Sequence, residues 1–257
     1  EVLHHGHEVK NVEGWWGHCN GWSVAAGLFP EPRQPVRVNG IDFSVADIKA
    51  AVTEASMLAS IDFYGTRMEK GHPVGSPEYN DVAPDVYFLL LTNYMGKLKH
   101  PVLIDQDISA AVWNQPLAGY RFEYPKPSDY LGADPRAPHI YRIIVSSKIW
   151  WASDNVGDPG MLTPEFKFQD EFPFDSRRLK MEVWLDGPVV FDANGKIVSS
   201  GNVIVTRNGE YHVGGAWKME EFMNQPGYDW AHLWPDYMWV PYQVVKFRQG
   251  WRGFFRS

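Results

Sequence analysis

The chain has 257 residues, of which 44% are hydrophobic and 21% charged, a composition typical of a globular protein with a real core. With 24 basic against 31 acidic residues, the net charge of −7 excludes nucleic acid and anionic membrane as main partners. The sequence contains no run of 18 apolar residues, so no membrane-spanning helix is predicted. Residues 1–10 are polar and do not have the pattern of a signal peptide. Its single cysteine, Cys19, excludes an intramolecular disulfide and a cysteine-based zinc cluster.

The first half of the chain is predicted to be helix-rich. The expected helices are residues 20–29, 44–61 and 85–95. Apolar residues recur at helical spacing in the first of these, and Pro30 ends it. Ser44 is a good N-cap for the second, with Asp47 three residues later as in a capping box. Gly96 is expected to end the third helix, and the apolar run 101–104 reads as a buried strand.

The second half is predicted to be β-rich. The expected strands are residues 120–124, 141–151, 179–185, 189–191, 197–198, 203–205, 211–217 and 242–247. Asn194-Gly195 and Asn208-Gly209 are predicted to form type I′ hairpin turns. Helices followed by antiparallel strands make an α+β protein. We expect a single domain over residues 1–257 with a helix-rich lobe (1–124) and a β-rich lobe (139–257), joined by the proline-rich residues 125–138.

Residues 14–23 carry the strongest chemical signal in the sequence. Glycines and tryptophans lead into a helix that begins at or next to Cys19. The positive end of a helix dipole favours a thiolate there, and free backbone N–H groups can hold the oxyanion that forms after attack on a carbonyl. Gly17 and Gly21 let a substrate backbone approach closely. The pattern predicts that Cys19 is a nucleophile.

Three segments resemble the transglutaminase elicitor family of plant-pathogenic oomycetes and marine bacteria. Residues 15–22, followed by Pro30-Glu31-Pro32, match the region around the family's cysteine. Residues 112–124 resemble the thirteen-residue peptide that plants recognise in those enzymes. A weaker match joins residues 215–217 to residues 235–239 and is similar to a Gly-Glu-Trp and His-Pro-Asp-Phe-Leu-Trp pairing.

The resemblance implies a papain-like core, with helices of the N-terminal half packed on a mainly antiparallel sheet. It implies that Cys19 attacks a glutamine side chain, releases ammonia and passes the acyl group from the thioester to a lysine amine. The partners implied are protein substrates bearing Gln and Lys, and the location is outside the cell. The oomycete enzymes depend on calcium, which is carried over by resemblance alone because no EF-hand spacing is present.

The base and its orienting group stay open at the level of sequence. His100 is the first candidate for the base, and His232 is the second because it precedes the Pro235-Asp236 match, although Trp234 stands where the family has the histidine. Asp105 or Asn114 could orient the base.

Trp16, Trp113 and Asn114 are the expected substrate contacts. Because Asn114, Gln115 and Pro116 are poor at filling a buried strand, their segment is predicted to form an exposed rim. Two rival functions use the same residues: a cysteine hydrolase, either a protease or a glutamine deamidase, and a non-enzymatic binding module that presents the Trp113 segment. The oligomeric state is left open.

Overall fold

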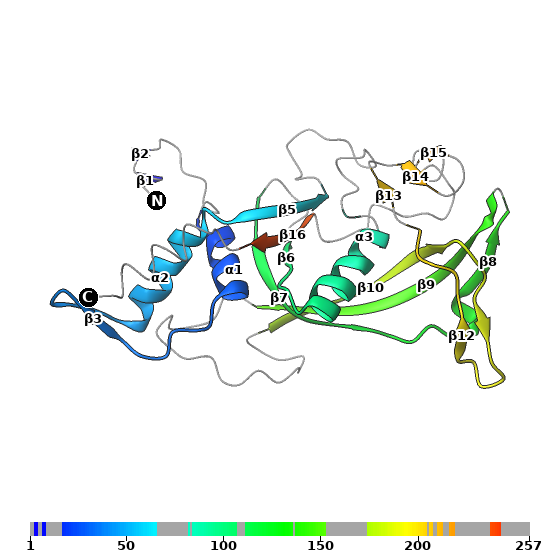
Figure 1. Ribbon diagram of the computed structural model, residues 1–257, viewed down its shortest axis with the longest axis horizontal. Coiled ribbons are helices and arrows are strands. Elements are labelled where there is room, and N and C mark those ends of the chain that lie inside the picture. The colour runs from blue at the N-terminus through cyan, green and yellow to red at the C-terminus, as the bar shows by residue number, and fades with distance from the viewer. Residues whose placement is uncertain are drawn as a thin grey trace.

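The protein combines a few helices with mainly antiparallel sheet, as a computed structural model shows (Figure 1). The structure describes residues 3–4, 7–8, 17–65, 82, 84–106, 111–135, 137–152, 174–204, 206–207, 210–212, 216–218 and 237–242. The predicted α+β class is confirmed in this coarse form.

A seven-stranded sheet organises the described residues. Its order is β10-β9-β7-β6-β16-β5, with β8 paired to β9, and all its pairs are antiparallel. The strands are β5 (Ser60–Gly65), β6 (Leu103–Asp105), β7 (Asn114–Phe122), β8 (Tyr130–Asp134), β9 (Ala137–Ala152), β10 (Phe174–Leu185) and β16 (Tyr237–Tyr242). This sheet runs through both halves of the chain, because β7 pairs with β6 on one side and with β9 on the other.

Small sheets stand beside the large one. They pair β1 (Leu3–His4) with β2 (His7–Glu8), β3 (Val36–Val38) with β4 (Ile41–Phe43), β11 (Val190–Phe191) with β12 (Ile197–Ser199), and β13 (Thr206–Arg207) with β14 (Glu210–His212) and β15 (Ala216–Lys218). Asn39 and Gly40, with φ of 49° and 80°, make the turn between β3 and β4. These positive angles are what a type I′ turn requires.

Helices cover both faces of the large sheet. Helices α1 (Cys19–Leu28) and α2 (Val45–Ser56) pack together at one end of the molecule (Figure 1). Val24 of α1 packs on Leu103 of β6. The other face carries α3 (Pro84–Leu89) and the π-helix η1 (Leu90–Leu98). Because neighbouring residues of a strand point to opposite faces, Leu103 belongs to the α1 face and Ile104 to the α3 face.

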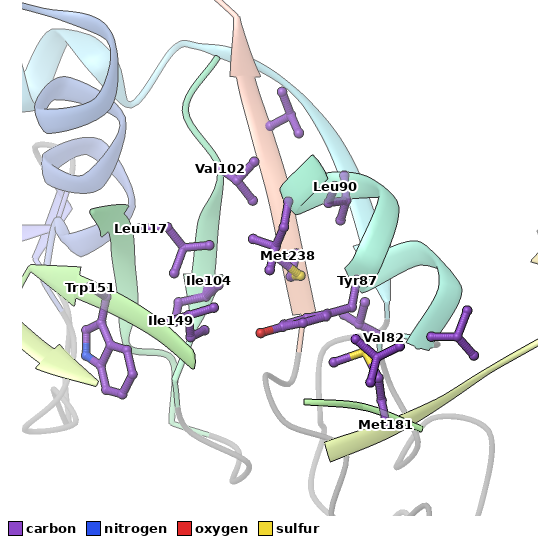
Figure 2. Packing of buried hydrophobic residues seen from close by; sticks show 14 of the residues in the cluster. Val82, Tyr87, Leu90, Val102, Ile104, Leu117, Ile149, Trp151, Met181 and Met238 are labelled. Carbon is purple, nitrogen blue, oxygen red and sulfur yellow. The ribbon is translucent and has the colours of Figure 1, made fainter. Parts of the chain in front are cut away.

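The main core lies under α3 and η1. Figure 2 shows the Tyr87 side chain of α3 next to Met238, with its hydroxyl end toward Ile104 and Ile149 of the sheet, and all four residues belong to one buried cluster. The Tyr87 hydroxyl is 3.1 Å from the buried Ser147 hydroxyl, so the one polar atom that this ring buries is satisfied. Burial raises the Tyr87 pKa above its ordinary value.

The helix boundaries correct two expectations. Ser44 caps α2 in a full capping box with Asp47, as predicted, but the helix ends at Ser56 and not near residue 61. Gly96 does not end the third helix, which continues as η1 until Lys99 adopts a left-handed φ of 54°. The glycine serves close packing instead, because a Cβ at Gly96 would lie 2.3 Å from the Tyr120 hydroxyl.

Two expectations about strands and turns were also wrong. β7 begins at Asn114 rather than near residue 120. The strand predicted over 242–247 lies outside the described residues except for Tyr242, which is the last residue of β16. In the turn before β12, Gly195 has a φ of 76°, but Asn194 is not left-handed, so the turn is not type I′. The Asp192 carboxylate holds this turn by accepting hydrogen bonds from the N–H groups of Asn194 and Lys196.

No helix in the described ranges is long and apolar enough to cross a membrane.

Candidate active site

Cys19 is the first residue of α1 and is half-buried. The first helical hydrogen bond runs from Trp22 N–H to His18 C=O at 2.9 Å, so the N–H groups of Cys19, Asn20 and Gly21 have no acceptor within the helix. A partly accessible thiol therefore sits beside backbone donors that could hold a negative oxygen.

Two groups at the start of β7 touch the thiol. The Asn114 side-chain amide nitrogen lies 3.6 Å from Cys19 Sγ and is a donor to it. Sγ in turn lies 3.7 Å from the Val112 carbonyl oxygen. Residues 93 and 95 positions further along the chain thus define the surroundings of the thiol. Because an amide donor supports a thiolate and a carbonyl accepts from a thiol, both protonation states of Cys19 have a partner here.

Asp105 fixes the segment that carries these two groups. Its side chain is fully buried, and its Oδ1 accepts a hydrogen bond from Trp113 N–H at 2.8 Å. Trp113 C=O accepts from Gln106 N–H at 3.1 Å. In the sheet register Asp105 lies directly opposite Asn114, so the two side chains share the α1 face. The carboxylate thereby holds the backbone between Val112 and Asn114 against the thiol.

The expected exposure of this segment was partly wrong. Asn114, Gln115 and Pro116 are buried in a central strand, whereas Trp113 is half-buried. Asn114 is tolerated there because its amide reaches the thiol. Pro116 needs no N–H partner, and the chain returns to the ladder through Leu117 N–H, which donates to the Val102 carbonyl at 3.0 Å.

The structure does not bring His100 to the thiol. His100 Nε2 lies 2.8 Å from the Pro241 carbonyl oxygen, and the ring stacks on Tyr242 at 5.3 Å between centroids. Strand β16 runs antiparallel to β6, with Met238 opposite Ile104, so its Pro241 end lies at the opposite end of β6 from Asp105. Five residues of extended chain separate His100 from Asp105, which corresponds to about 17 Å.

Two predicted site residues, Trp16 and His232, lie outside the residues that the structure describes. His232 precedes Tyr237, the first residue of β16, by five positions. The register places Tyr237 at the Asp105 end of the sheet, since Met238 pairs with Ile104.

Sequence reasoning missed two contacts of the site. His18 Nδ1 lies 2.7 Å from Glu54 Oε2 of α2, an ion pair when the ring is protonated, and so ties the residue before Cys19 to the second helix. The Val112 carbonyl is a backbone group, so no side-chain pattern could have pointed to it. The proximity of Asn114 to Cys19 had a signal only in the family resemblance.

The described part of the chain contains no cluster of side chains suited to a calcium ion. No group of three or more His, Cys, Asp or Glu side chains there could hold a metal ion.

Comparison with known proteins adds a family match over about half of the chain. The family described as transglutaminase elicitor matches residues 5–129, which confirms the resemblance that the sequence motifs indicated. The crystal structure of the GP42 transglutaminase from Phytophthora sojae is similar with 21% identity and a TM-score of 0.46. That similarity covers 90% of this chain, which spans 56% of the GP42 chain. No curated protein sequence matches.

Proposed function

We propose, from the membership of residues 5–129 in the transglutaminase elicitor family, that this chain is a protein-glutamine γ-glutamyltransferase with Cys19 as its nucleophile. The observation that carries the proposal is the thiol at the start of α1, with the Asn114 amide 3.6 Å from its sulfur and the buried Asp105 paired opposite Asn114. A papain-like arrangement of helix and sheet and a location outside the cell are parts of the same proposal.

The reaction proceeds in two acyl transfers. The Cys19 thiolate attacks the carboxamide carbon of a glutamine side chain, forming a C–S bond, and the C–N bond breaks as ammonia leaves with a proton from the general acid. The amine of a lysine then attacks the thioester, forming the isopeptide C–N bond and breaking the C–S bond. Its proton passes to the general base, and the thiolate is regenerated.

The described residues supply stabilisation and positioning. Backbone N–H groups at the start of α1 and the Asn114 amide are the donors for the tetrahedral oxyanion. In this proposal Asp105 orients the base and holds the Trp113 backbone, and the half-buried Trp113 ring helps to keep water away from the thioester. Exclusion of water favours transfer to an amine over hydrolysis.

We assign the general base to His232 ahead of His100. The reason is that His100 is held by the Pro241 carbonyl and Tyr242, whereas His232 precedes the end of β16 that pairs beside Asp105. Five extended residues span about 17 Å, so the chain from Tyr237 is long enough to bring an imidazole to the thiol.

Incorporation of a fluorescent primary amine into a glutamine-bearing protein tests the function, with ammonia release measured in parallel. Wild type is expected to incorporate the amine, and the nearly isosteric Cys19→Ser protein is expected to fold and lose the activity. Ammonia release without incorporation would indicate a deamidase, and a folded Cys19→Ser protein with substantial activity would contradict the mechanism. His232→Ala is expected to abolish transfer, with His100→Ala as the matched control that retains it.

A further inference from the structure

The α1 face of the large sheet carries a row of positive charges. In the register of three neighbouring strands, Arg121 of β7 lies opposite Lys148 of β9, and Lys148 lies opposite Arg178 of β10. Lys180 follows two residues after Arg178 on the same face. We call these four residues, Arg121, Lys148, Arg178 and Lys180, the cationic row.

The cationic row and the thiol lie on the same face. Ile149 and Tyr120, which neighbour Lys148 and Arg121 in sequence, pack into the core under α3. Side chains alternate along a strand, so the cationic row points to the opposite face, which is the one that α1 covers through Leu103. Strand β7 connects the two places, with Asn114 at the thiol and Arg121 seven residues further on. This separation corresponds to about 20 Å along the strand.

Two exposed members of the row carry charges that no described carboxylate pairs with. Arg178 pairs with Glu123 at 2.5 Å, but among the residues that the structure describes Arg121 and Lys180 have no ion pair, and both are exposed. Arg121 lies over the Trp150 ring at 6.0 Å from its centroid, and the buried Lys148 lies over the same ring at 5.1 Å. Like charges directly opposite each other on a sheet are destabilising, and this chain has a net charge of −7, so the concentration of cations does not follow from composition.

We propose that the exposed members of the cationic row, Arg121, Arg178 and Lys180, bind carboxylate side chains of the glutamine-bearing substrate, about six to eight residues from the reactive glutamine. The inference rests on the proposed transferase function and names the class of its acyl donor: proteins with acidic residues flanking the glutamine. The acyl donor is the partner to be recognised, because it is tethered to Cys19 as the thioester while its flanking chain lies along the same face. An acceptor flank rich in lysine would be repelled by the same charges.

Two synthetic peptides with one glutamine each test the proposal, used with a fluorescent primary amine as acceptor. One carries glutamates six to eight residues away on both sides of the glutamine, and the other carries serines at the same positions. Wild type is expected to show a KM about fivefold lower for the acidic peptide than for the serine peptide, with similar kcat. The difference is expected to vanish in 0.5 M salt, where the Debye length is only about 4 Å and exposed charges are screened.

Arg121→Glu and Lys180→Glu are each expected to remove this preference while leaving the kinetics of the serine peptide unchanged. Lys180→Glu keeps the test valid if loss of the contact with Trp150 unfolds the Arg121 variant. Arg37→Glu is the matched control, because it reverses an exposed charge on β3 and is expected to keep the preference.

Equal KM values for the two peptides in wild type, or the same loss on both peptides in the variants, would overturn the proposal. Transfer to the serine peptide by wild type separates this failure from failure of the enzyme itself, since that reaction needs no acidic flank. If wild type transfers to neither peptide, the proposed function is contradicted, and so is the binding role of the cationic row.

Discussion

Replacement of Asp105 separates a structural from a chemical role for this carboxylate. Asp105→Asn keeps an oxygen that can accept from Trp113 N–H, so the backbone beside the thiol is retained and only the charge is lost. The change from a charge-assisted to a neutral hydrogen bond costs about 1 kcal/mol. For a chain of this length that lowers the thermal midpoint by roughly 2–4 °C. If the carboxylate orients the base, kcat should fall by roughly 10²–10⁴ with little change in KM.

Asp105→Ala removes the acceptor as well. Trp113 N–H then loses its partner next to a fully buried position, and a small cavity remains. The two effects together cost roughly 2–4 kcal/mol, which corresponds to a midpoint lowered by roughly 5–15 °C. The alanine variant should therefore lose both stability and activity, whereas the asparagine variant should lose activity almost alone.

The assay pairs a thermal melt with steady-state kinetics of amine incorporation on the same sample. Asp134→Asn is the matched control, because Asp134 is a buried carboxylate of β8 that lies 3.6 Å from Arg142, on a strand that pairs with β9 and not with β6 or β7. It should lose stability and keep kcat. A stable Asp105→Asn protein with unchanged kcat would refute an orienting charge and leave Asp105 as a support for Trp113 alone.

Three further substitutions probe the surroundings of the site. The Trp113→Ala protein should stay folded, because the ring is only half-buried. We expect a thermal midpoint lower by a few degrees and a transfer rate reduced at least tenfold. An unfolded protein would show that Trp113 is a core residue instead. Gly21→Ala should destabilise the protein by about 1–3 kcal/mol, since its Cβ would lie 2.4 Å from the Thr53 carbonyl oxygen where α1 crosses α2, and a denaturant titration measures this. Burial raises the pKa of Glu182 despite the Trp184 hydrogen bond, so the stability tied to this carboxyl is present below its unfolded pKa and is lost as pH rises through the folded value. Glu182→Gln should therefore raise the midpoint near pH 7 and have no effect in acid, and an equal effect at both pH values would contradict the burial argument.

Local patterns in the sequence predicted the helices of the N-terminal half. Ser44 with Asp47 marks the start of α2, and the structure contains the full capping box. Cys19 was expected at a helix start, and it is the first residue of α1. Both predictions depend on neighbours in the chain, because caps and first turns are made by residues three or four positions apart.

The features that the sequence could not show depend on contacts between residues far apart in the chain. Asn114, Gln115 and Pro116 looked unsuited to a buried strand, but all three pair with β6 in the interior of the large sheet. Gly96 looked like a helix end, because only the position of Tyr120 shows that it is a packing contact. The environment of the thiol has the same origin, since its partners come from almost a hundred residues away.

Strand β7 couples stability to chemistry in this molecule. Its first residue, Asn114, touches the thiol; its middle residue, Leu117, belongs to the main core; and near its end Arg121 joins the cationic row. A register shift within β7 lies between Leu117 and Gly119, so a bulge separates the half that serves the thiol from the half that pairs with β9. Bulges re-aim the side chains that follow them. If the same residues formed a regular strand without the bulge, alternation from Leu117 would turn Arg121 into the core under α3 and place Tyr120 on the α1 face. The bulge is therefore the feature that puts the thiol and the cationic row on one surface.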